Sequence, residues 1–372
     1  MSATYTITIL DASGNVAALM DTKAVHTLWY ERLLNDVSQA QFTIPARDAR
    51  AALIGKHTWF EVHRWPDPAT EQLEGTFLVV LKDTFQDESG LEWLVVSGVS
   101  PEFLLLPRIL DVRNDPLAAG GYSTKLLPID DLMAEIVLQQ AGPGAGAHGS
   151  TPSQRIPGLT IAPTASTGPN VPYRGAWDSL LTILKDLSVG DRMDFRIVRG
   201  LGLSLEFRAA IIGADKTRTT NYPTSPFVLF TPEAGTITNP RLTYDWREER
   251  TVVYLLGKGA GGYRELYGTM QSNFNETPYS YAAVVEDLRQ SDSALETIEQ
   301  ALQALAKHRA RKSFTFDLAR PDMTDHALWD LGDFVTVQWN GTSEDMRITG
   351  MKDEVSADGE VLTPTVRGRY EQ

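Results

Sequence analysis

The feature that most constrains the fold is an internal resemblance between two stretches of the chain that lie 270 residues apart. Leu78 to Gly98 reads LVVLKDTFQDESGLEWLVVSG, and Ile348 to Gly368 reads ITGMKDEVSADGEVLTPTVRG. Each stretch carries a Lys-Asp pair and ends in a glycine, at one constant offset. The matched residues are Lys82 and Lys352, Asp83 and Asp353, and Gly98 and Gly368. Such a repeat predicts two copies of one module, so it has to be considered before the fold is assigned.

The resemblance extends upstream through loops of different length. Phe42-Thr43-Ile44 and Phe314-Thr315-Phe316 are each followed by a loop that ends in Gly55 or Gly332, and a further strand follows each glycine. Two unrelated β-meanders would share the same turn chemistry, which is the alternative interpretation. The preserved order of four features favours a duplicated all-β module, with Gly55 and Gly332 at equivalent positions.

The second copy also contains a clear hairpin signal. Phe334 to Trp339 is an apolar run that leads into Asn340-Gly341, the dipeptide most typical of a two-residue hairpin turn. A strand beginning at Ile348 follows. We therefore expect antiparallel strands throughout this stretch.

Length and composition predict a globular protein of two or three domains. The chain has 372 residues, of which 42% are hydrophobic and 22% are charged. The longest apolar runs, such as Phe103 to Leu106, are too short to span a bilayer, and the start MSATYTITIL does not resemble a signal peptide. We expect synthesis in the cytoplasm without a Sec signal, and no stable membrane insertion.

Cysteine usage and charge exclude several classes of function. The sequence has no Cys, which excludes disulfides, thiolate metal sites and thiol nucleophiles. The formal net charge is −14. An acidic surface disfavours non-specific electrostatic binding to nucleic-acid phosphates, which depends on Lys and Arg.

The pattern of periodic segments predicts a mainly β protein with an α+β insertion. We expect the first β-module at residues 1–107, a smaller α+β domain at residues 108–228, and the second β-module at residues 229–372. In the middle domain, Pro128 to Gln140 and Trp177 to Val189 have helical spacing, and residues 194–198 and 203–209 read as a hairpin. Residues 141–172 hold six Gly and six Pro and predict an irregular loop.

One long helix is predicted in the last third of the chain, at residues 291–311. Leu295, Ile298, Leu302 and Leu305 recur at helical spacing, and Ser293 with Glu296 forms a capping-box pattern. The narrow apolar stripe could pack on the helix's own domain or against a neighbouring chain, and the first is the safer interpretation.

Motifs that would carry chemistry are weak. Gly257 to Gly262 matches G-x-G-x-x-G after a strand, but no helical pattern follows to receive a pyrophosphate, so we interpret it as a loop between strands. No H-E-x-x-H or G-x-S-x-G motif is present. His57 and His63 could lie on one face of a strand and bind a metal ion there. Surface or core imidazoles without a metal are the commoner case. No catalytic pair can be chosen from 48 Asp and Glu, and the eight Trp and twelve Tyr form no clear stacking platform.

The order of elements resembles the hub proteins at the distal end of long phage tails and of related contractile injection systems. Three segments carry the resemblance: PRLTYDWREERTVVYLLGKGAGGYRE at Pro240 to Glu265, VEDLR at Val285 to Arg289, and DLGDFVTVQW at Asp330 to Trp339. The Gly/Pro-rich loop at residues 141–172 is longer than a compact hub needs. It could order against a neighbouring tail protein.

The resemblance implies two similar β-barrel hub domains per subunit and a homotrimer that forms a pseudo-sixfold ring. It implies no catalytic residue, no cofactor and no metal. The implied partners are a distal tail or tail tube protein, a tape-measure protein and a spike or fibre protein, with DNA only in transit through the lumen. The implied location is the tail tip of a virion assembled in the host cytoplasm. Two alternatives stay open: a tail-associated enzyme that degrades cell walls, either an endopeptidase or a glycan hydrolase, and a carbohydrate-binding receptor module.

Overall fold

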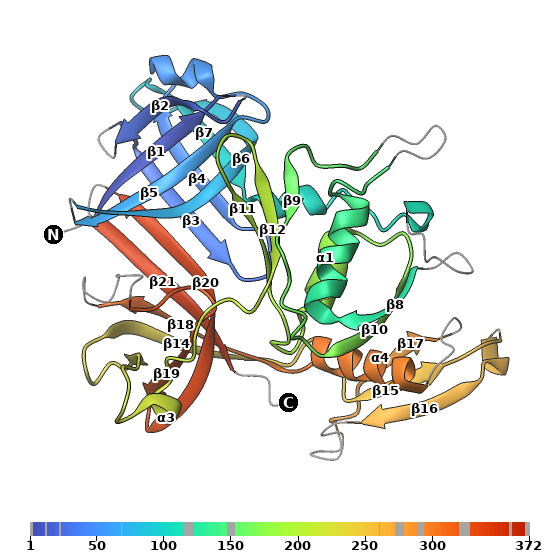
Figure 1. Ribbon diagram of the computed structural model, residues 1–372. Helices are drawn as coiled ribbons and strands as arrows, with labels where there is room; N and C mark the ends of the chain where they lie inside the picture. Colours follow the sequence, from blue (N-terminus) through green and yellow to red (C-terminus); the bar gives the residue numbers. More distant parts are fainter. Residues whose placement is uncertain are drawn as a thin grey trace.

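The computed structural model describes most of the chain. The described residues are 3–11, 13–21, 24–67, 69–114, 123–146, 153–259, 261–271, 279–288, 294–319, 328–356 and 359–368. Figure 1 shows two β-rich regions, one above the other, with an α+β region beside them and a small helix-and-sheet unit at the lower edge.

The first β-domain is formed by seven strands near the N-terminus. They are β1 (Thr4–Leu10), β2 (Val16–Asp21), β3 (Thr27–Leu33), β4 (Gln39–Pro45), β5 (Trp59–Asp67), β6 (Thr70–Gln86) and β7 (Glu92–Val99). Their alternating residues build one core, which includes Ile9, Phe42, Phe60 and Phe77. A 3₁₀ helix, η1 (Ala49–Leu53), connects β4 to β5.

The second β-domain uses strands from the last part of the chain and two short preceding segments. They are β13 (Leu229–Phe230), β14 (Ile237–Asp245), β18 (Arg311–Leu318), β19 (Phe334–Trp339), β20 (Thr342–Ser356) and β21 (Gly359–Gly368). Its core includes Phe230, Phe314, Trp329 and Ile348. The predicted hairpin is confirmed, because β19 and β20 are joined by Asn340 and Gly341, both with positive φ.

The two β-domains share one order of strands. In the first domain the neighbours run β3-β4-β7-β6-β5, and in the second they run β14-β18-β21-β20-β19, with every adjacent pair antiparallel. Pairing of β20 with β3 joins both orders into one sheet, whose main path ends at β14 and β2. The predicted fold class, mainly β with two similar β-modules and an α+β insertion, is confirmed.

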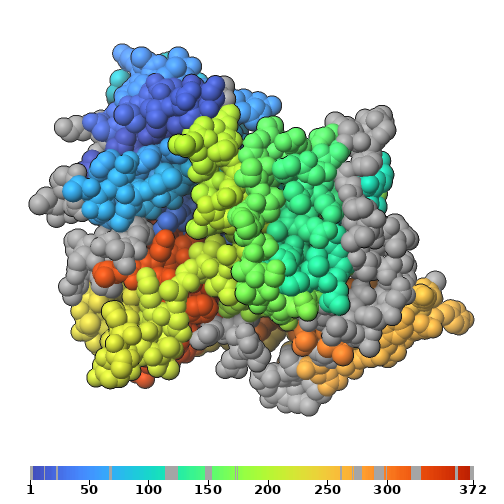
Figure 2. Space-filling model, viewed as in Figure 1, coloured from blue at the N-terminus to red at the C-terminus, as the bar shows by residue number. Residues whose placement is uncertain are grey.

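The middle domain follows β7 and packs beside both β-domains (Figures 1 and 2). Its elements are η2 (Pro101–Leu105), η3 (Val112–Asn114), β8 (Ser123–Pro128), α1 (Ile129–Gln140), β9 (Leu159–Ile161), β10 (Asn170–Gly175), α2 (Leu180–Leu187), β11 (Phe195–Arg199) and β12 (Leu205–Ala209). Both helices place most of their leucines and isoleucines in a core with Phe195 and Phe207. The predicted β11–β12 hairpin is confirmed. A short helix, α3 (Arg218–Asn221), follows on the way to β13.

The prediction of an irregular loop at residues 141–172 is wrong for part of that stretch. β9 adds to β12 as a parallel strand, and β10 pairs with β8. Ile156, Leu159 and Val171 are buried in the core of the middle domain. This apolar burial orders the segment against its own chain, despite the many glycines and prolines.

A peripheral unit is inserted between β14 and β18. It comprises the sheet β16-β15-β17, formed by β15 (Val252–Leu256), β16 (Leu266–Gln271) and β17 (Ala283–Asp287), and the helix α4 (Ala294–Lys307). These elements have a separate core of Val253, Leu255, Leu288, Ala301 and Ala304. The chain leaves and re-enters the second β-domain at one place, because Asp245 is paired with Arg311.

The long helix ends earlier than the sequence predicts. α4 stops at Lys307, and Arg311 already opens β18, because Phe314 and Phe316 alternate into the core of the second β-domain. The predicted cap at Ser293 lies outside the described residues. The boundaries at residues 107 and 228 stay predictions, and the separate core of the peripheral unit argues for dividing residues 229–372 further.

Candidate functional site

The most distinctive site is the strand pair that joins the two β-domains. β20 pairs with β19 through Thr342–Arg347, and its second half continues alongside β3 of the first β-domain. At this junction Lys352 faces Glu31, Asp353 faces Tyr30 and Glu354 faces Trp29. The red β20 and the blue β3 can be followed side by side in Figure 1. The backbone hydrogen bonds of the ladder therefore bind the two domains into one sheet.

A buried carboxylic acid lies on the inner face of this junction. Asp353 is fully buried and accepts hydrogen bonds at Oδ2 from the hydroxyl groups of Tyr5 and Tyr30, the latter at 2.9 Å. Burial, together with the neighbouring carboxylate of Glu360, raises the pKa of Asp353 to about 7. The same burial raises the pKa of Tyr5, so this hydroxyl stays protonated and keeps donating.

Two arginines, one buried and one partly buried, complete the polar layer around Asp353. Arg64 of β5, 1% exposed, donates to Glu360 Oε1 at 2.8 Å and to the Tyr5 hydroxyl at 3.1 Å. Arg32 of β3 contacts Glu74 at 3.7 Å and donates to Asp330 at 2.7 Å. Side chains from both β-domains thus hydrogen-bond with one another, which favours one register of the junction.

A second buried node ties the middle domain to both β-domains. Asp194, 1% exposed, pairs with Arg347 of β20 and accepts from Asn35 Nδ2 at 2.7 Å. Arg347 also donates to Asp191 at 2.9 Å and to the carbonyl oxygen of Ile212 at 3.0 Å. Charge-assisted hydrogen bonds therefore hold the middle domain against both β-domains, in addition to the covalent chain connections.

Among the strand edges without a described partner, one in each β-domain carries an exposed aromatic side chain. Residues Leu81–Gln86 of β6 pair with β7 on one side only, and β14 pairs only with β18. Leu81 is 55% exposed and Phe85 is 45% exposed on the first edge, and Tyr244 is 48% exposed on the second. Exposed apolar edges of this length are templates for further strand pairing.

The two Lys-Asp pairs singled out in the sequence lie in corresponding hairpins, β6–β7 and β20–β21. Lys82 Nζ donates to the carbonyl oxygens of Ala51 and Ile54 at 3.1 and 2.9 Å, so it caps the end of η1. Asp83 is exposed. Lys352 pairs with Glu354 and lies 5.8 Å from the ring centre of Trp29, and Asp353 is the buried acid described above.

The registers of the two hairpins favour an offset of 269 residues between their first strands, β6 and β20. Each hairpin contains one irregularity, between Val79 and Leu81 in β6 and between Ile348 and Gly350 in β20. Matching these positions aligns Val79 with Ile348, which both lie in the cores, and aligns Asp83 with Lys352. A slip of one residue moves a side chain to the other face of the sheet. The equivalence of Lys82 with Lys352 stays a prediction, as does that of Asp83 with Asp353.

The four glycines of the predicted repeat have different surroundings. Gly332 has φ +92°, and a Cβ atom there would lie 2.5 Å from the carbonyl oxygen of Ile212, whereas one at Gly55 would meet nothing closer than 3.9 Å. Gly98 lies against the rings of Phe60 and Phe77. Gly368 lies opposite Met346 at the end of β21. Their equivalence also stays a prediction.

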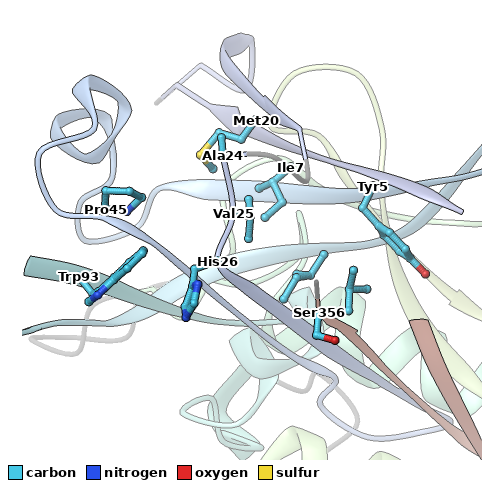
Figure 3. A pocket seen from close by; sticks show the side chains of 11 residues that line it. Tyr5, Ile7, Met20, Ala24, Val25, His26, Pro45, Trp93 and Ser356 are labelled. Carbon is cyan, nitrogen blue, oxygen red and sulfur yellow. The ribbon is translucent and has the colours of Figure 1, made fainter. Parts of the chain in front are cut away.

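A pocket of about 480 Å³ opens in the first β-domain beside the junction (Figure 3). Its lining is mostly apolar and includes Ile7, Met20 and Val355. His26 and Trp93 stack at its rim with ring centres 4.5 Å apart. Among the described residues that line the pocket there is no Asp or Glu.

Other chemical motifs find no site in the described parts of the chain. No group of three or more His, Asp or Glu that could hold a metal ion occurs there. His57 lies in a turn with φ 67° and not on the strand that carries His63, so the predicted shared face is wrong. The loop at Gly257 connects two antiparallel strands, β15 and β16, as predicted. Within the described residues, no helix is both long and apolar enough for a membrane span.

Sequence reasoning missed the residues that hold the junction together. Nothing in the sequence singled out Tyr5, Tyr30, Arg64 or Glu74. The available signal was a charged residue at an inward position of an alternating strand, as with Arg64 between Val62 and Trp65. Such a residue requires a buried partner, but the sequence does not show which residue that partner is.

Solved structures named as tail proteins share this fold. The chain is similar to the tail protein from Neisseria meningitidis MC58, with 14% identity, TM-score 0.58 and coverage of 98% of both chains. It is also similar to the 43 kDa tail protein of prophage MuSo2 from Shewanella oneidensis, with 12% identity, TM-score 0.56 and coverage of 98% and 99%. Prophage tail protein gp18 from Listeria monocytogenes EGD-e matches with 11% identity, TM-score 0.52 and coverage of 100% and 96%.

No curated protein matches the sequence. A family model does match, and it spans residues 6–366, which include both β-domains, the middle domain and the peripheral unit. With the fold of tail proteins and a family match over nearly its whole length, the chain belongs to the family of Siphovirus ReqiPepy6 Gp37-like proteins.

Proposed function

We propose that this protein is a structural hub at the distal end of a phage tail, where three copies form a pseudo-sixfold ring. The observation that carries the proposal is the five-strand order that occurs twice in one chain and is joined through β20 and β3. Three copies of such a chain present six similar β-domains. A threefold assembly can then meet a sixfold tube.

The ring would join the tail tube or distal tail protein to the spike or fibre and to the tape-measure protein. The middle domain and the peripheral unit lie to one side of the β-domains in Figure 1, where they are available for such contacts. The net charge of −14 suits a lumen through which DNA passes, because like charges repel. The protein would be assembled in the host cytoplasm and carried in the virion.

The test combines oligomeric state with location. Sedimentation of the purified chain, alone and with tail extracts, is expected to give a species with the mass of three chains. Gold-labelled antibodies against the protein are expected to mark the tip of intact tails. Labelling along the tube or on the capsid would overturn the proposal, and so would a stable assembly of any number of copies other than three.

We also propose that the role is structural and not catalytic. The alternative, a tail-associated endopeptidase or glycan hydrolase, is tested by incubating the protein with purified cell walls. Unchanged turbidity is expected. Lysis that disappears on substitution of a single Asp or Glu would contradict the structural assignment.

A further inference from the structure

The junction inside the chain is a template for a junction between chains. β20 corresponds to β6 in the repeated strand order, and β3 corresponds to β14. Within one chain β20 pairs with β3. No described strand covers either of the corresponding edges, Leu81–Gln86 of β6 and the outer side of β14.

The register of the second junction follows from the first. Matching the strand irregularities places Leu81 at the position of Gly350 and Asp83 at that of Lys352. On the other side, the ladders through β4 and β18 place Thr243 at the position of Glu31. Because Lys352 faces Glu31 within the chain, Asp83 should face Thr243.

The side chains that this register brings together are complementary. It sets Phe85 opposite Arg241, where a cation–π pair can form. It also places Asp83 diagonally to Arg241. The corresponding diagonal pair within the chain is Lys352 and Trp29, where Nζ lies 5.8 Å from the ring centre. Opposite charges on a diagonal attract, so the pairing gains an ion pair.

We propose that Leu81–Gln86 of one copy forms an antiparallel ladder with Arg241–Asp245 of the next copy, with Asp83 opposite Thr243. The closure of this contact at three copies rests on the proposed function. Each chain supplies one edge of each kind, so the contact is head-to-tail and can continue around a ring. The ring would then contain six similar strand junctions, of which three lie within chains and three between them.

Paired cysteines test this register directly, because the natural chain has no cysteine. The test variant is Asp83→Cys with Thr243→Cys. The matched control is Lys352→Cys with Glu31→Cys, which are paired within one chain in the corresponding positions. A register control, Asp83→Cys with Arg241→Cys, moves one cysteine two residues along the same face. Each variant is oxidised at high protein concentration, and the products are separated without reducing agent and weighed by sedimentation.

The expected result is a covalent species of two and then three chains for the test variant, with none larger. The matched control should close within single chains, which establishes that the pairing geometry allows a disulfide. A trimer that stays free of disulfides in the test variant, while the control closes, would overturn the strand pairing and leave the ring intact. A ladder beyond three chains would support the pairing but overturn the ring. Monomers without interchain disulfides would count against both.

Discussion

The hydroxyl group of Tyr30 donates a 2.9 Å hydrogen bond to Asp353, across the strand pair that joins the two β-domains. The Tyr5 hydroxyl donates to the same carboxylate oxygen. Two phenols therefore hold one buried acid at the point where the domains meet. An acid in this position makes the stability of the junction depend on pH.

The pH dependence has a defined sign. The pKa of Asp353 is about 7 in the folded protein, above its value of about 3.9 in an unfolded chain, so the folded state binds the extra proton between these values. The free energy of unfolding should therefore fall as pH rises from about 4 to 7, by on the order of 3 kcal/mol or less from this group. Urea denaturation at several pH values measures it. Asp353→Asn should flatten this part of the profile, and an unchanged slope would contradict the assignment.

Loss of the arginine at the second node should destabilise the fold strongly. Arg347→Ala leaves Asp194 buried without its cationic partner, and we expect a loss of about 3–5 kcal/mol in the free energy of unfolding. Arg247→Ala is the control, because Arg247 is exposed and the loss of its surface pair with Asp245 should leave the stability almost unchanged. Similar losses of unfolding free energy for both variants would show that Arg347 does not stabilise the contact between the middle domain and the β-domains.

The two glycines that the repeat predicts to be equivalent should respond differently to alanine. Gly332→Ala places a Cβ atom against the carbonyl oxygen of Ile212 at a positive φ, and we expect a loss of about 2 kcal/mol or more. Gly55→Ala meets open space at an ordinary φ and should change stability by less than about 1 kcal/mol. Thermal unfolding of both variants distinguishes them. Equal losses would argue that Gly55 and Gly332 share one backbone role after all.

Charge reversal tests the contact between copies without cysteine chemistry. Asp83→Lys or Arg241→Glu alone should weaken self-association several-fold, because each places like charges on the diagonal. The double variant should recover most of the lost affinity. Sedimentation equilibrium measures the association constants of all four proteins. Single variants that associate like the unchanged chain, or a double variant weaker than both, would refute the ion pair.

Much of the β architecture could be predicted because its signals are local. Asn340-Gly341 determines a two-residue turn through its backbone conformation, and the alternation in Phe314 and Phe316 predicts a strand with one buried face. The proposed repeat was suggested by the preserved order of short motifs. Its offset was predicted as 270 where the ladders favour 269, since matching Lys-Asp pairs in the sequence does not reveal which residues face each other across the strands.

The rest depends on contacts between distant residues. Asp353 meets Tyr5 from the other end of the chain, and nothing near either residue identifies its partner. The same holds for β9, whose three residues form a strand only because β12 offers an edge. Glycine and proline counts describe the local freedom of residues 141–172, but burial of Ile156 and Val171 decides their fold.

The position of the peripheral unit has an evolutionary consequence. The unit begins after Asp245 and ends before Arg311, and these two residues face each other in one ladder. The second β-domain therefore accommodates the unit as it would accommodate a hairpin loop between two paired strands. Insertions, deletions or replacement of the whole unit can therefore accumulate while the strands of the second β-domain keep their sequence. Within this family, residues 246–310 are where we expect lineages to diverge in length and to adapt to different neighbours.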